Sequence, residues 1–279
     1  MLVFPNCKIN LGLNIVAKRS DGYHDLETIF YPIPFCDALE IIQSPIATVA
    51  DETAGIRFSA SGLPVAGNTS SNLCVKAYQL IKNDFPQLPK VQTHLHKFIP
   101  MGAGFGGGSS DGAFALQLLN NTFGMGLTEN QLLDYALQLG SDCPFFIINK
   151  PCFATGRGEK LQRVDLDLKG LQLVLINPGI HVSTRKAFAA IKPASPAIHA
   201  NEIVAKPIAE WKQLLTNDFE TSVFKLYPQL AAIKQALYNA GAAYASMTGT
   251  GSTVFGIFQN PIANLPAFDP AYLVKQIAL

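Results

Sequence analysis

The sequence predicts an α+β protein with two domains, residues 1–155 and 156–279. The chain has 279 residues, which is enough for two domains that each bury a core. Segments whose apolar residues alternate, as they do in strands, are interspersed with segments of helical periodicity. A glycine-rich stretch near the middle of the chain further predicts a ligand-binding loop.

The composition is that of an ordinary globular protein and excludes several partners. Apolar residues make up 48% of the chain and charged residues 15%. The net charge is +1, with 21 basic and 20 acidic residues and no long run of one sign, so no broad surface for nucleic acid is expected. The longest apolar runs, such as 145–148, are far shorter than the roughly 18 residues of a membrane span. We therefore expect a cytoplasmic protein that binds neither nucleic acid nor membrane.

Neither the cysteines nor the histidines predict a metal site. The five cysteines are an odd number without CxxC spacing, so we expect reduced and mostly buried thiols. His94 and His96 would lie on one face of a strand and could ligate a metal, but no cysteine or acidic residue accompanies them. Exposed strand histidines are the favoured interpretation.

The N-terminal segment predicts a half-buried strand. Between Val3 and Ile15 most odd-numbered residues are apolar, whereas Lys8, Asn10 and Asn14 occupy even positions. Lys8 and Asn10 therefore share one face. A single lysine on such a strand is ordinarily a solvated charge, and only its combination with other motifs gives it a further role.

Residues 100–116, PMGAGFGGGSSDGAFAL, contain six glycines within thirteen residues and then become apolar. Glycine allows positive φ values and a close approach of the backbone to a ligand, at a cost in conformational entropy that a simple connection seldom carries. We expect a helix to begin at about Ser110, with Ser109, Ser110 and Asp111 as capping residues. A glycine loop before a helix N-terminus favours binding of a di- or triphosphate. The loop lacks the GK[ST] ending of a Walker A motif, and a glycine-rich turn without a ligand is the alternative.

A candidate catalytic carboxylate, Asp142, follows a predicted helix. Residues 128–131 have capping-box spacing, and the apolar stripe after them ends at Gly140. Residues 143–148, CPFFII, predict an apolar strand. A carboxylate between a buried helix and such a strand is costly unless it is hydrogen-bonded or functional, although a simple capping role is the alternative.

The second half of the chain predicts a further strand, turn and helix start. Residues 171–176 predict a strand, 177–179 a turn, and Ser183 or Thr184 the first residue of a helix that carries Phe188. We expect the start of this helix to face a ligand, as the helix start after the glycine-rich loop does.

A second glycine-rich loop, residues 246–256, lies between a predicted helix at 230–240 and a predicted strand at 253–258. Its glycines allow close approach, and we expect it to support a site rather than to bind a nucleotide through its threonines. Residues 59–71 are rich in Gly, Ser, Asn and Pro and predict a loop.

Several of these segments resemble the motifs of the GHMP kinases, a family named for galacto-, homoserine, mevalonate and phosphomevalonate kinases. Residues 100–110, PMGAGFGGGSS, closely resemble the second motif, which wraps the ATP phosphates. Residues 5–11 resemble the first motif, residues 246–256 the third, and GSDCPFF at 140–146 the GxDVPFF segment. The resemblance covers most of the chain. It implies a two-domain GHMP kinase fold, with a ribosomal S5 domain 2-like N-terminal domain that binds ATP and a ferredoxin-like C-terminal domain that binds the substrate.

The resemblance also implies roles for individual residues. Lys8 would lie beside the reacting hydroxyl and the γ-phosphate, and Asp142 would take the proton from the attacking alcohol. Mg²⁺ would accompany ATP; its ligands stay unknown, with Ser109, Ser110 and Asp142 as candidates. The residues expected at ATP are Asn72, Lys97, Pro100, Met101, Gly102, Ala103, Gly104, Phe105, Gly106, Gly107, Gly108, Ser109 and Ser110. The residues expected at the substrate are Asn10, which would orient the catalytic groups, Tyr23 and His24, which would receive a cytosine, Thr184, and Phe188, which would cover the other face of that base.

One further segment narrows the expected substrate. Residues 19–26, RSDGYHDL, resemble the RxDGYHxL signature of the family members that phosphorylate a cytidyl-diphospho-methylerythritol. This implies that small molecule as the partner, and a tyrosine face and an imidazole suit a nucleobase. A core role for Tyr23 and Phe188, a mevalonate- or homoserine-type kinase, and a nucleotide-binding regulator without catalysis are the alternatives. The sequence leaves open whether the protein is a monomer or a homodimer.

Overall fold

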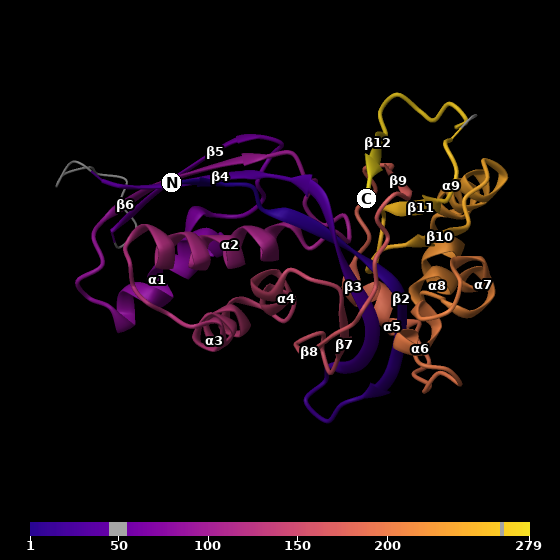
Figure 1. Cartoon of the computed structure of the whole chain (residues 1–279), viewed down its shortest axis with the longest axis horizontal. Coiled ribbons are helices and arrows are strands. Elements are labelled where there is room, and N and C mark those ends of the chain that lie inside the picture. The colour runs from indigo at the N-terminus through magenta and orange to yellow at the C-terminus, as the bar shows by residue number, and fades with distance from the viewer. Residues whose placement is uncertain (45–54, 263–264) are drawn as a thin grey trace. The chain divides into compact units, whose positions relative to one another are not determined.

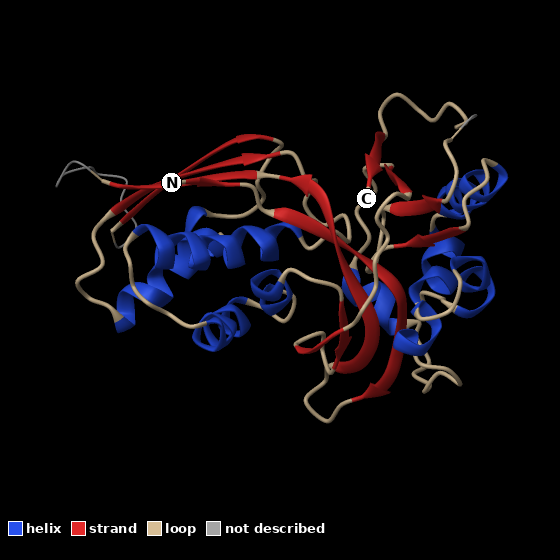
Figure 2. Ribbon diagram, in the orientation of Figure 1, coloured by secondary structure: helices blue, strands red, loops and turns tan. Residues whose placement is uncertain are grey.

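The structure, a computed structural model, describes residues 1–44, 55–262 and 265–279. Contacts within the chain define two compact units. Unit 1 comprises residues 1–7, 35–101 and 106–150, and unit 2 comprises residues 8–34, 102–105 and 151–279. Both units combine helices with strands, as Figure 2 shows. The α+β class predicted from the sequence is therefore confirmed.

Unit 1 is a four-stranded sheet with helices packed on one face (Figure 1). The strand order is β1-β4-β6-β5, and only β5 runs parallel to its neighbour. Along β4, Leu39 and Ile41 are buried while Glu40 is exposed, because alternate side chains point to opposite faces. The elements are β1 (Leu2–Val3), β4 (Ala38–Gln43), β5 (Ile56–Gly62), the short 3₁₀ helix Thr69–Ser71, α1 (Leu73–Asp84), β6 (Val91–Lys97), α2 (Gly107–Thr122), α3 (Glu129–Leu139) and α4 (Cys143–Ile148).

Unit 2 holds two further sheets in its described residues, with strand orders β2-β3-β7-β8 and β10-β11-β9-β12. The first residues of β2 and the last of β3 belong to unit 1. The strands are β2 (Asn6–Lys18), β3 (His24–Cys36), β7 (Cys152–Thr155), β8 (Lys160–Arg163), β9 (Gln172–Asn177), β10 (Tyr244–Met247), β11 (Val254–Phe258) and β12 (Leu273–Ala278). The helices are α5 (Thr184–Ala189), α6 (Ala200–Val204), α7 (Ile208–Leu214), α8 (Phe219–Leu226) and α9 (Pro228–Asn239).

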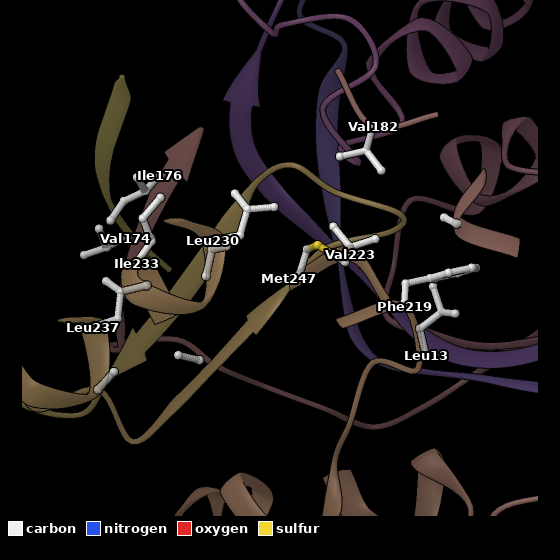
Figure 3. Close-up of a cluster of buried hydrophobic side chains, with 14 of the residues drawn as sticks. Leu13, Val174, Ile176, Val182, Phe219, Val223, Leu230, Ile233, Leu237 and Met247 are labelled. Carbon is white, nitrogen blue, oxygen red and sulfur yellow. The ribbon is translucent and has the colours of Figure 1, made fainter. Parts of the chain in front are cut away.

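The core of unit 2 joins β2 to the second sheet and its helices. Leu13 of β2, Phe219 and Val223 of α8, and Met247 at the end of β10 belong to one cluster of buried apolar side chains (Figure 3). Burying each such side chain contributes about 1.5–3 kcal/mol. The cluster therefore holds β2 and the end of β10 together, and these segments carry the part of the candidate site that belongs to unit 2.

Several elements agree with the prediction. Thr128 and Gln131 form the expected capping box, in which the Thr128 N–H donates to Gln131 Oε1 at 2.9 Å, and α3 ends before Gly140. The strand predicted at 171–176 is β9, the helix predicted at 230–240 is α9, and the strand predicted at 253–258 is β11. Four of the five cysteines are buried. Along the described ranges, no helix has both the length and the apolar character that crossing a membrane demands.

The apolar strand predicted at 143–148 is wrong, because these residues form helix α4. Pro144 lies in the first turn, where its missing N–H and fixed φ suit a helix. Asn149 ends the helix with a left-handed φ of 47°. Five of the six helical residues are buried, and periodicity alone does not separate a short helix buried all round from a buried strand.

Two element boundaries also differ from the prediction. Helix α2 begins at Gly107 rather than at about Ser110, and its N-cap is Gly106, with φ of 68° and no capping side chain. The Ser110 hydroxyl and the Asp111 carboxylate are instead buried and bonded elsewhere. Residues 59–62, expected in a loop, belong to β5, because pairing with β6 overrides their local turn propensity.

Strand β2 is buried on both faces over its first half, so the half-buried strand of the prediction is wrong. Lys8 is 3% exposed and Asn10 is 2% exposed. A lysine is almost never buried to this degree unless it is paired, which excludes the solvated-charge interpretation.

The two compact units are each made of several segments, whereas the prediction divides the chain once, at residue 155. Residues 8–34 group with the C-terminal part of the chain, because β2 and β3 complete a sheet whose other strands, β7 and β8, follow residue 150. The division into an ATP-binding domain, 1–155, and a substrate-binding domain, 156–279, stays a prediction.

Candidate active site

Lys8 and Asn10 lie on the same face of β2 and are joined by a hydrogen bond. Lys8 Nζ donates to Asn10 Oδ1 at 2.5 Å and lies 4.8 Å from the centroid of the Phe30 ring on β3. Asn10 Nδ2 donates to Thr28 Oγ1 at 3.1 Å, and the Thr28 hydroxyl donates to the Gly12 carbonyl. A buried ammonium needs such partners, since burial penalises an uncompensated charge. β2 and β3 thus hold one buried cation whose position Asn10 fixes.

The loop between β10 and β11 holds both the backbone and the side chain of Asn10. Thr248 Oγ1 accepts the Asn10 N–H at 3.1 Å, and the Gly249 N–H donates to Asn10 Oδ1 at 3.0 Å. Gly104 packs against this loop so closely that a Cβ there would lie 2.1 Å from the Thr248 carbonyl oxygen. Gly104 also has a φ of +85°, so only glycine fits. This geometry agrees with a supporting role for the loop. Sequence reasoning did not single out Thr28, because a threonine on a strand carries no distinctive signal.

We expect Thr248→Val to destabilise the protein by about 1–3 kcal/mol, the cost of leaving a buried donor without its acceptor. The donor is the Asn10 N–H, which Thr248 Oγ1 accepts in a fully buried environment. Urea unfolding followed by circular dichroism measures the loss. Thr250→Val makes the same chemical change two residues further along the loop and should leave the unfolding free energy within about 0.5 kcal/mol of the wild type. Equal stability of the Thr248 variant and this control would contradict the role of the hydroxyl.

The glycine-rich loop leads from β6 into α2, and its last glycines form the first turn of that helix. Gly102, Gly104 and Gly106 all have positive φ values. The first amide N–H groups of a helix have no acceptor within it, and the helix dipole adds partial positive charge at this end. A side chain at Gly108 would meet nothing within 4 Å, so the outer side of the turn is open. A chain of phosphates fits such a turn.

Beneath this turn lies a buried cluster of one lysine and two carboxylates. Lys97 Nζ donates to Asp111 Oδ2 at 2.8 Å, pairs with Asp37, and lies 3.5 Å from the position of a Cβ at Gly107. Asp37 also accepts the N–H groups of the two residues after Lys97, at 2.6 and 2.9 Å. Asp111 Oδ1 is buried without a hydrogen-bond partner among the described residues. Burial raises the pKa of Asp111 to about 7, although the neighbouring Lys97 opposes the rise.

The two carboxylates that hold Lys97 argue against the direct nucleotide contact that the family resemblance implied. The Lys97 side chain is 1% exposed, and both carboxylates of the cluster hold its ammonium. Lys97 therefore supports the glycine turn from below. Sequence reasoning missed Asp37, whose only signal is a charged residue between two apolar strand segments, and treated Asp111 as a helix cap.

The other loop residues of unit 2 are fixed mainly through their backbone. The Lys8 N–H donates to the Phe105 carbonyl at 3.0 Å, and the Thr253 N–H donates to the Ala103 carbonyl at 3.4 Å. The side chains of Ala103 and Phe105 are buried. These two residues therefore hold the loop in place, and any contact of theirs with ATP would involve backbone atoms.

The remaining residues expected at ATP belong to unit 1. Asn72 caps α1 by accepting the Cys74 N–H at 2.9 Å, which occupies its side-chain oxygen. Ser110 is buried and donates to the Asn6 carbonyl at 2.6 Å. Met101 is exposed and Pro100 is half-buried. Asn72 and Ser110 thus have structural partners, while Met101 is open to solvent.

Asp142 lies at the start of α4 and is half-buried. Its carboxylate does not cap that helix, so the simple capping alternative is wrong. The next residue, Cys143, shares a side-chain hydrogen bond with Ser109 in the first turn of α2, and burial raises the pKa of its thiol to about 12. Unit 1 therefore brings the chain at Asp142 next to the glycine turn.

Aromatic residues of unit 2 form a second part of the candidate site. The His24 ring on β3 stacks on Phe188 of α5, with centroids 4.9 Å apart and an interplanar angle of 28°. Tyr23 is 57% exposed, so a core role for it is wrong, and the Arg157 guanidinium lies 5.1 Å from its ring centroid. Thr184 is exposed one turn before Phe188. Arg157 carried no signal in the sequence, since an arginine in a Gly-rich turn is common.

The donor set near the glycine turn suits a magnesium ion that arrives with the nucleotide. Among the residues that the structure describes, no three His, Cys, Asp or Glu side chains cluster as a metal site. Mg²⁺ bound with a nucleotide typically keeps several waters and takes one or two protein ligands besides the phosphates. Asp142 and Ser109 supply oxygen donors of that kind beside the open turn.

Models of one family match both halves of the chain. Residues 72–150 match the GHMP kinases N terminal domain, and residues 198–265 match the GHMP kinases C terminal domain. The chain therefore belongs to the GHMP kinase family, as the resemblance of its motifs predicted.

Individual relatives are close over nearly the whole length. The 4-diphosphocytidyl-2-C-methyl-D-erythritol kinase of Bacteroides fragilis is 53% identical over 258 residues, 92% of each chain. The protein of the same name from Bacteroides thetaiotaomicron is 50% identical over 271 residues, 96% of each chain. The crystal structure of a 4-(cytidine 5'-diphospho)-2C-methyl-D-erythritol kinase is 30% identical, with a TM-score of 0.78 over 94% of this chain and 91% of that one. The two-domain GHMP kinase fold is thus confirmed.

Proposed function

We propose that this protein transfers the γ-phosphoryl group of ATP to the 2-hydroxyl of 4-diphosphocytidyl-2-C-methyl-D-erythritol, in non-mevalonate isoprenoid precursor biosynthesis. Membership of the GHMP kinases supports the ATP-dependent transfer. Relatives that are 50–53% identical are named 4-diphosphocytidyl-2-C-methyl-D-erythritol kinase, which supports this acceptor alcohol. The observation that carries the proposal is the group of Tyr23, His24 and Phe188, in which the Tyr23 ring is 57% exposed and the His24 ring stacks on Phe188.

The first turn of α2 binds the phosphates of ATP in this proposal. Its amide N–H groups and helix dipole neutralise part of their charge without any exposed lysine on the turn. Gly108 leaves space above the turn, and the Lys97 cluster supports it from below. When bound, Mg²⁺ supplies further charge neutralisation on the phosphate oxygens.

Asp142 and Lys8 carry out the transfer. The Asp142 carboxylate takes the proton of the acceptor hydroxyl while that oxygen bonds to the γ-phosphorus and the bond from that phosphorus to the bridging oxygen of ADP breaks. Phosphoryl transfer needs positioning, charge stabilisation and one proton acceptor, so these groups are sufficient. The Lys8 ammonium, held by Asn10, stabilises the charge on the transferred oxygens.

Tyr23, His24 and Phe188 hold the cytosine. A nucleobase stacks on an aromatic face, and an imidazole can hydrogen-bond its edge. His24 already stacks on Phe188, and Phe188 in turn packs edge-on against the buried Phe219 at 4.8 Å. The pair is therefore a fixed platform, whereas the exposed Tyr23 ring is available to close over the base.

We expect Tyr23→Ala to raise the KM for the cytidyl substrate by about tenfold, since loss of one stacking face costs on the order of 1–3 kcal/mol. The KM for ATP should stay unchanged, because Tyr23 is not part of the glycine turn that binds the phosphates. Steady-state kinetics with each substrate varied in turn measures both constants. Tyr23→Phe keeps the ring and is the matched control, for which both constants should equal those of the wild type. An unchanged KM for the cytidyl substrate in Tyr23→Ala would remove Tyr23 from base recognition.

A panel of alcohols tests the acceptor itself. We expect transfer to 4-diphosphocytidyl-2-C-methyl-D-erythritol and none to mevalonate, homoserine or the uncytidylated methylerythritol phosphate, with product detected by ³¹P NMR. Efficient phosphorylation of mevalonate or homoserine would favour the alternative acceptor. ATP binding without transfer to any member would favour a regulator without catalysis. A cytoplasmic location and an assembly of one or two copies stay predictions.

A further inference from the structure

A cavity of about 860 Å³ lies within unit 2, and none of the residues assigned above to ATP or to the substrate lines it. Its walls come from residues 190–198, which follow α5, from the end of α7, and from α8. Sites for small organic ligands have volumes of roughly 300–1,000 Å³ and combine apolar walls with a few polar groups. The size of this cavity is therefore that of a ligand site.

The lining defines the chemistry of the ligand. Apolar side chains, including Ile191, Leu214 and the exposed Leu226, form much of the surface. The ionisable lining side chains are Lys192, Lys225 and Asp218. In the described part of the chain, neither lysine pairs with a carboxylate. An apolar wall with two available ammonium groups suits an anion that carries a hydrocarbon body.

The single acidic group of the cavity is already engaged. Asp218 Oδ2 accepts the Ile15 N–H at 2.7 Å, and Asp218 Oδ1 accepts Asn14 Nδ2 at 3.2 Å. Asp218 therefore ties the cavity floor to β2, and its single negative charge faces two lysines, so the lining is positive overall. Lys192 and Lys225 therefore favour a negatively charged ligand.

One short segment before α8, residues 216–218, connects this cavity with the Asn10 network. It runs beside β2, where the Leu13 N–H donates to the Thr216 carbonyl and the Asp218 N–H donates to the Leu13 carbonyl, each at 2.8 Å. Thr216 and Asp218 line the cavity. Asn217, which lies between them and bridges to Leu13, does not line the cavity.

Asn217 reaches the loop that holds Asn10. Its Nδ2 donates to the Met247 carbonyl at 2.7 Å and to the Gly249 carbonyl at 2.9 Å. The Gly249 N–H in turn donates to Asn10 Oδ1, which also accepts Lys8 Nζ. Hydrogen bonds thus form a continuous path from residues 216–218 to the buried lysine.

We propose that this cavity is a second ligand site, which binds a small organic anion with an apolar body through Lys192 and Lys225 and changes phosphoryl transfer through Asn217. The ligand is a phosphate or carboxylate on a short hydrocarbon chain. The proposal concerns a site separate from the one that holds ATP and the acceptor alcohol.

Calorimetric titration of the full chain with n-hexyl phosphate tests the site. Saturating AMP-PNP is present throughout, so that the glycine turn is occupied and the probe does not bind there. Hexyl phosphate should bind, while inorganic phosphate, 1-hexanol and hexyltrimethylammonium should not. Hexanoate is titrated in parallel, and its affinity relative to hexyl phosphate distinguishes a carboxylate site from a phosphate site.

Variants assign the binding to the cavity. The double variant Lys192→Gln/Lys225→Gln should raise the dissociation constant for hexyl phosphate by at least about tenfold, because the loss of one charge-assisted hydrogen bond has an effect of that size. Thr221→Trp fills the cavity from α8 and should abolish binding. Lys206→Gln removes an exposed lysine that does not line the cavity, and it should bind as the wild type does. Thermal melts establish that each variant is folded.

The kinetic readout tests the connection. Hexyl phosphate should change kcat of the wild type and of Lys206→Gln and leave kcat of the double variant unchanged. Absence of binding, or equal binding by the double variant, overturns the site. Binding at the cavity without any change in kcat overturns the connection through Asn217. Because calorimetry needs no turnover, these outcomes are separate from a failure of the proposed kinase activity.

Discussion

Asp142→Asn is expected to bind ATP as tightly as the wild type and to turn over about 10²–10⁴-fold more slowly. An amide has nearly the shape of a carboxylate but does not accept the proton of the attacking hydroxyl. The Asp142 carboxylate does not cap α4, so the substitution removes no helix cap. The glycine turn is unchanged, which preserves the phosphate contacts. Calorimetric titration gives the ATP affinity, and coupled detection of ADP gives kcat.

The control for this variant is Asp134→Asn, which makes the same change at an exposed position of α3. Its kcat and its ATP affinity should equal those of the wild type. Near-normal turnover of Asp142→Asn would remove that residue from the mechanism. A parallel loss of ATP affinity would instead assign Asp142 to nucleotide or metal binding.

Lys97→Met is expected to lower the free energy of unfolding by about 3–5 kcal/mol, the usual cost of removing one partner from a buried ion pair. Methionine fills a similar volume, so the main loss is electrostatic. The substitution leaves Asp37 and Asp111 buried side by side without the ammonium that both now contact. Urea unfolding measures the loss. Lys76→Met, at an exposed position of α1, is the matched control and should change stability by no more than about 0.5 kcal/mol.

The loss in Lys97→Met should depend on pH, with a sign that follows from proton uptake. Burial already raises the pKa of Asp111 to about 7, and removal of Lys97 eliminates the group that opposes this rise. The folded variant therefore takes up a proton that the unfolded chain releases at lower pH, so its stability increases as the pH falls. The destabilisation should be largest near about pH 8 and smaller near about pH 5. A pH-independent loss would show that packing, not charge, accounts for it.

The sequence predicts best those elements whose signals are local. The capping box at Thr128 and the glycine at 140 bound α3 correctly, because each acts within one helical turn. The prediction fails where burial hides the period, as in α4, and where pairing decides, as in β5. The contribution of β2 and β3 to unit 2 depends on strands more than a hundred residues away, which no local pattern reveals.

The same distinction applies to the site. Motif resemblance indicated Lys8, Asn10, Asp142 and the aromatic residues, and the structure gives each a defined environment. The motif resemblance did not indicate Asp37, because tertiary structure decides which residue pairs with a buried lysine. Arg157 reaches Tyr23 only because a turn after β7 returns to the start of β3, which the pairing of these two strands establishes.

The discontinuous composition of unit 2 has a consequence for its biosynthesis. Residues 8–34 leave the ribosome before the rest of unit 2, because the strand β7 that pairs with β3 begins at Cys152 and the helices of unit 2 lie beyond residue 183. Residues 1–150, by contrast, contain every segment of unit 1. Unit 1 can therefore be completed while the C-terminal part is still being translated, and unit 2 is completed only near the end of translation. A chain truncated at residue 150 would retain β2 and β3 without the strand on which β3 closes its sheet, leaving an exposed edge prone to intermolecular pairing.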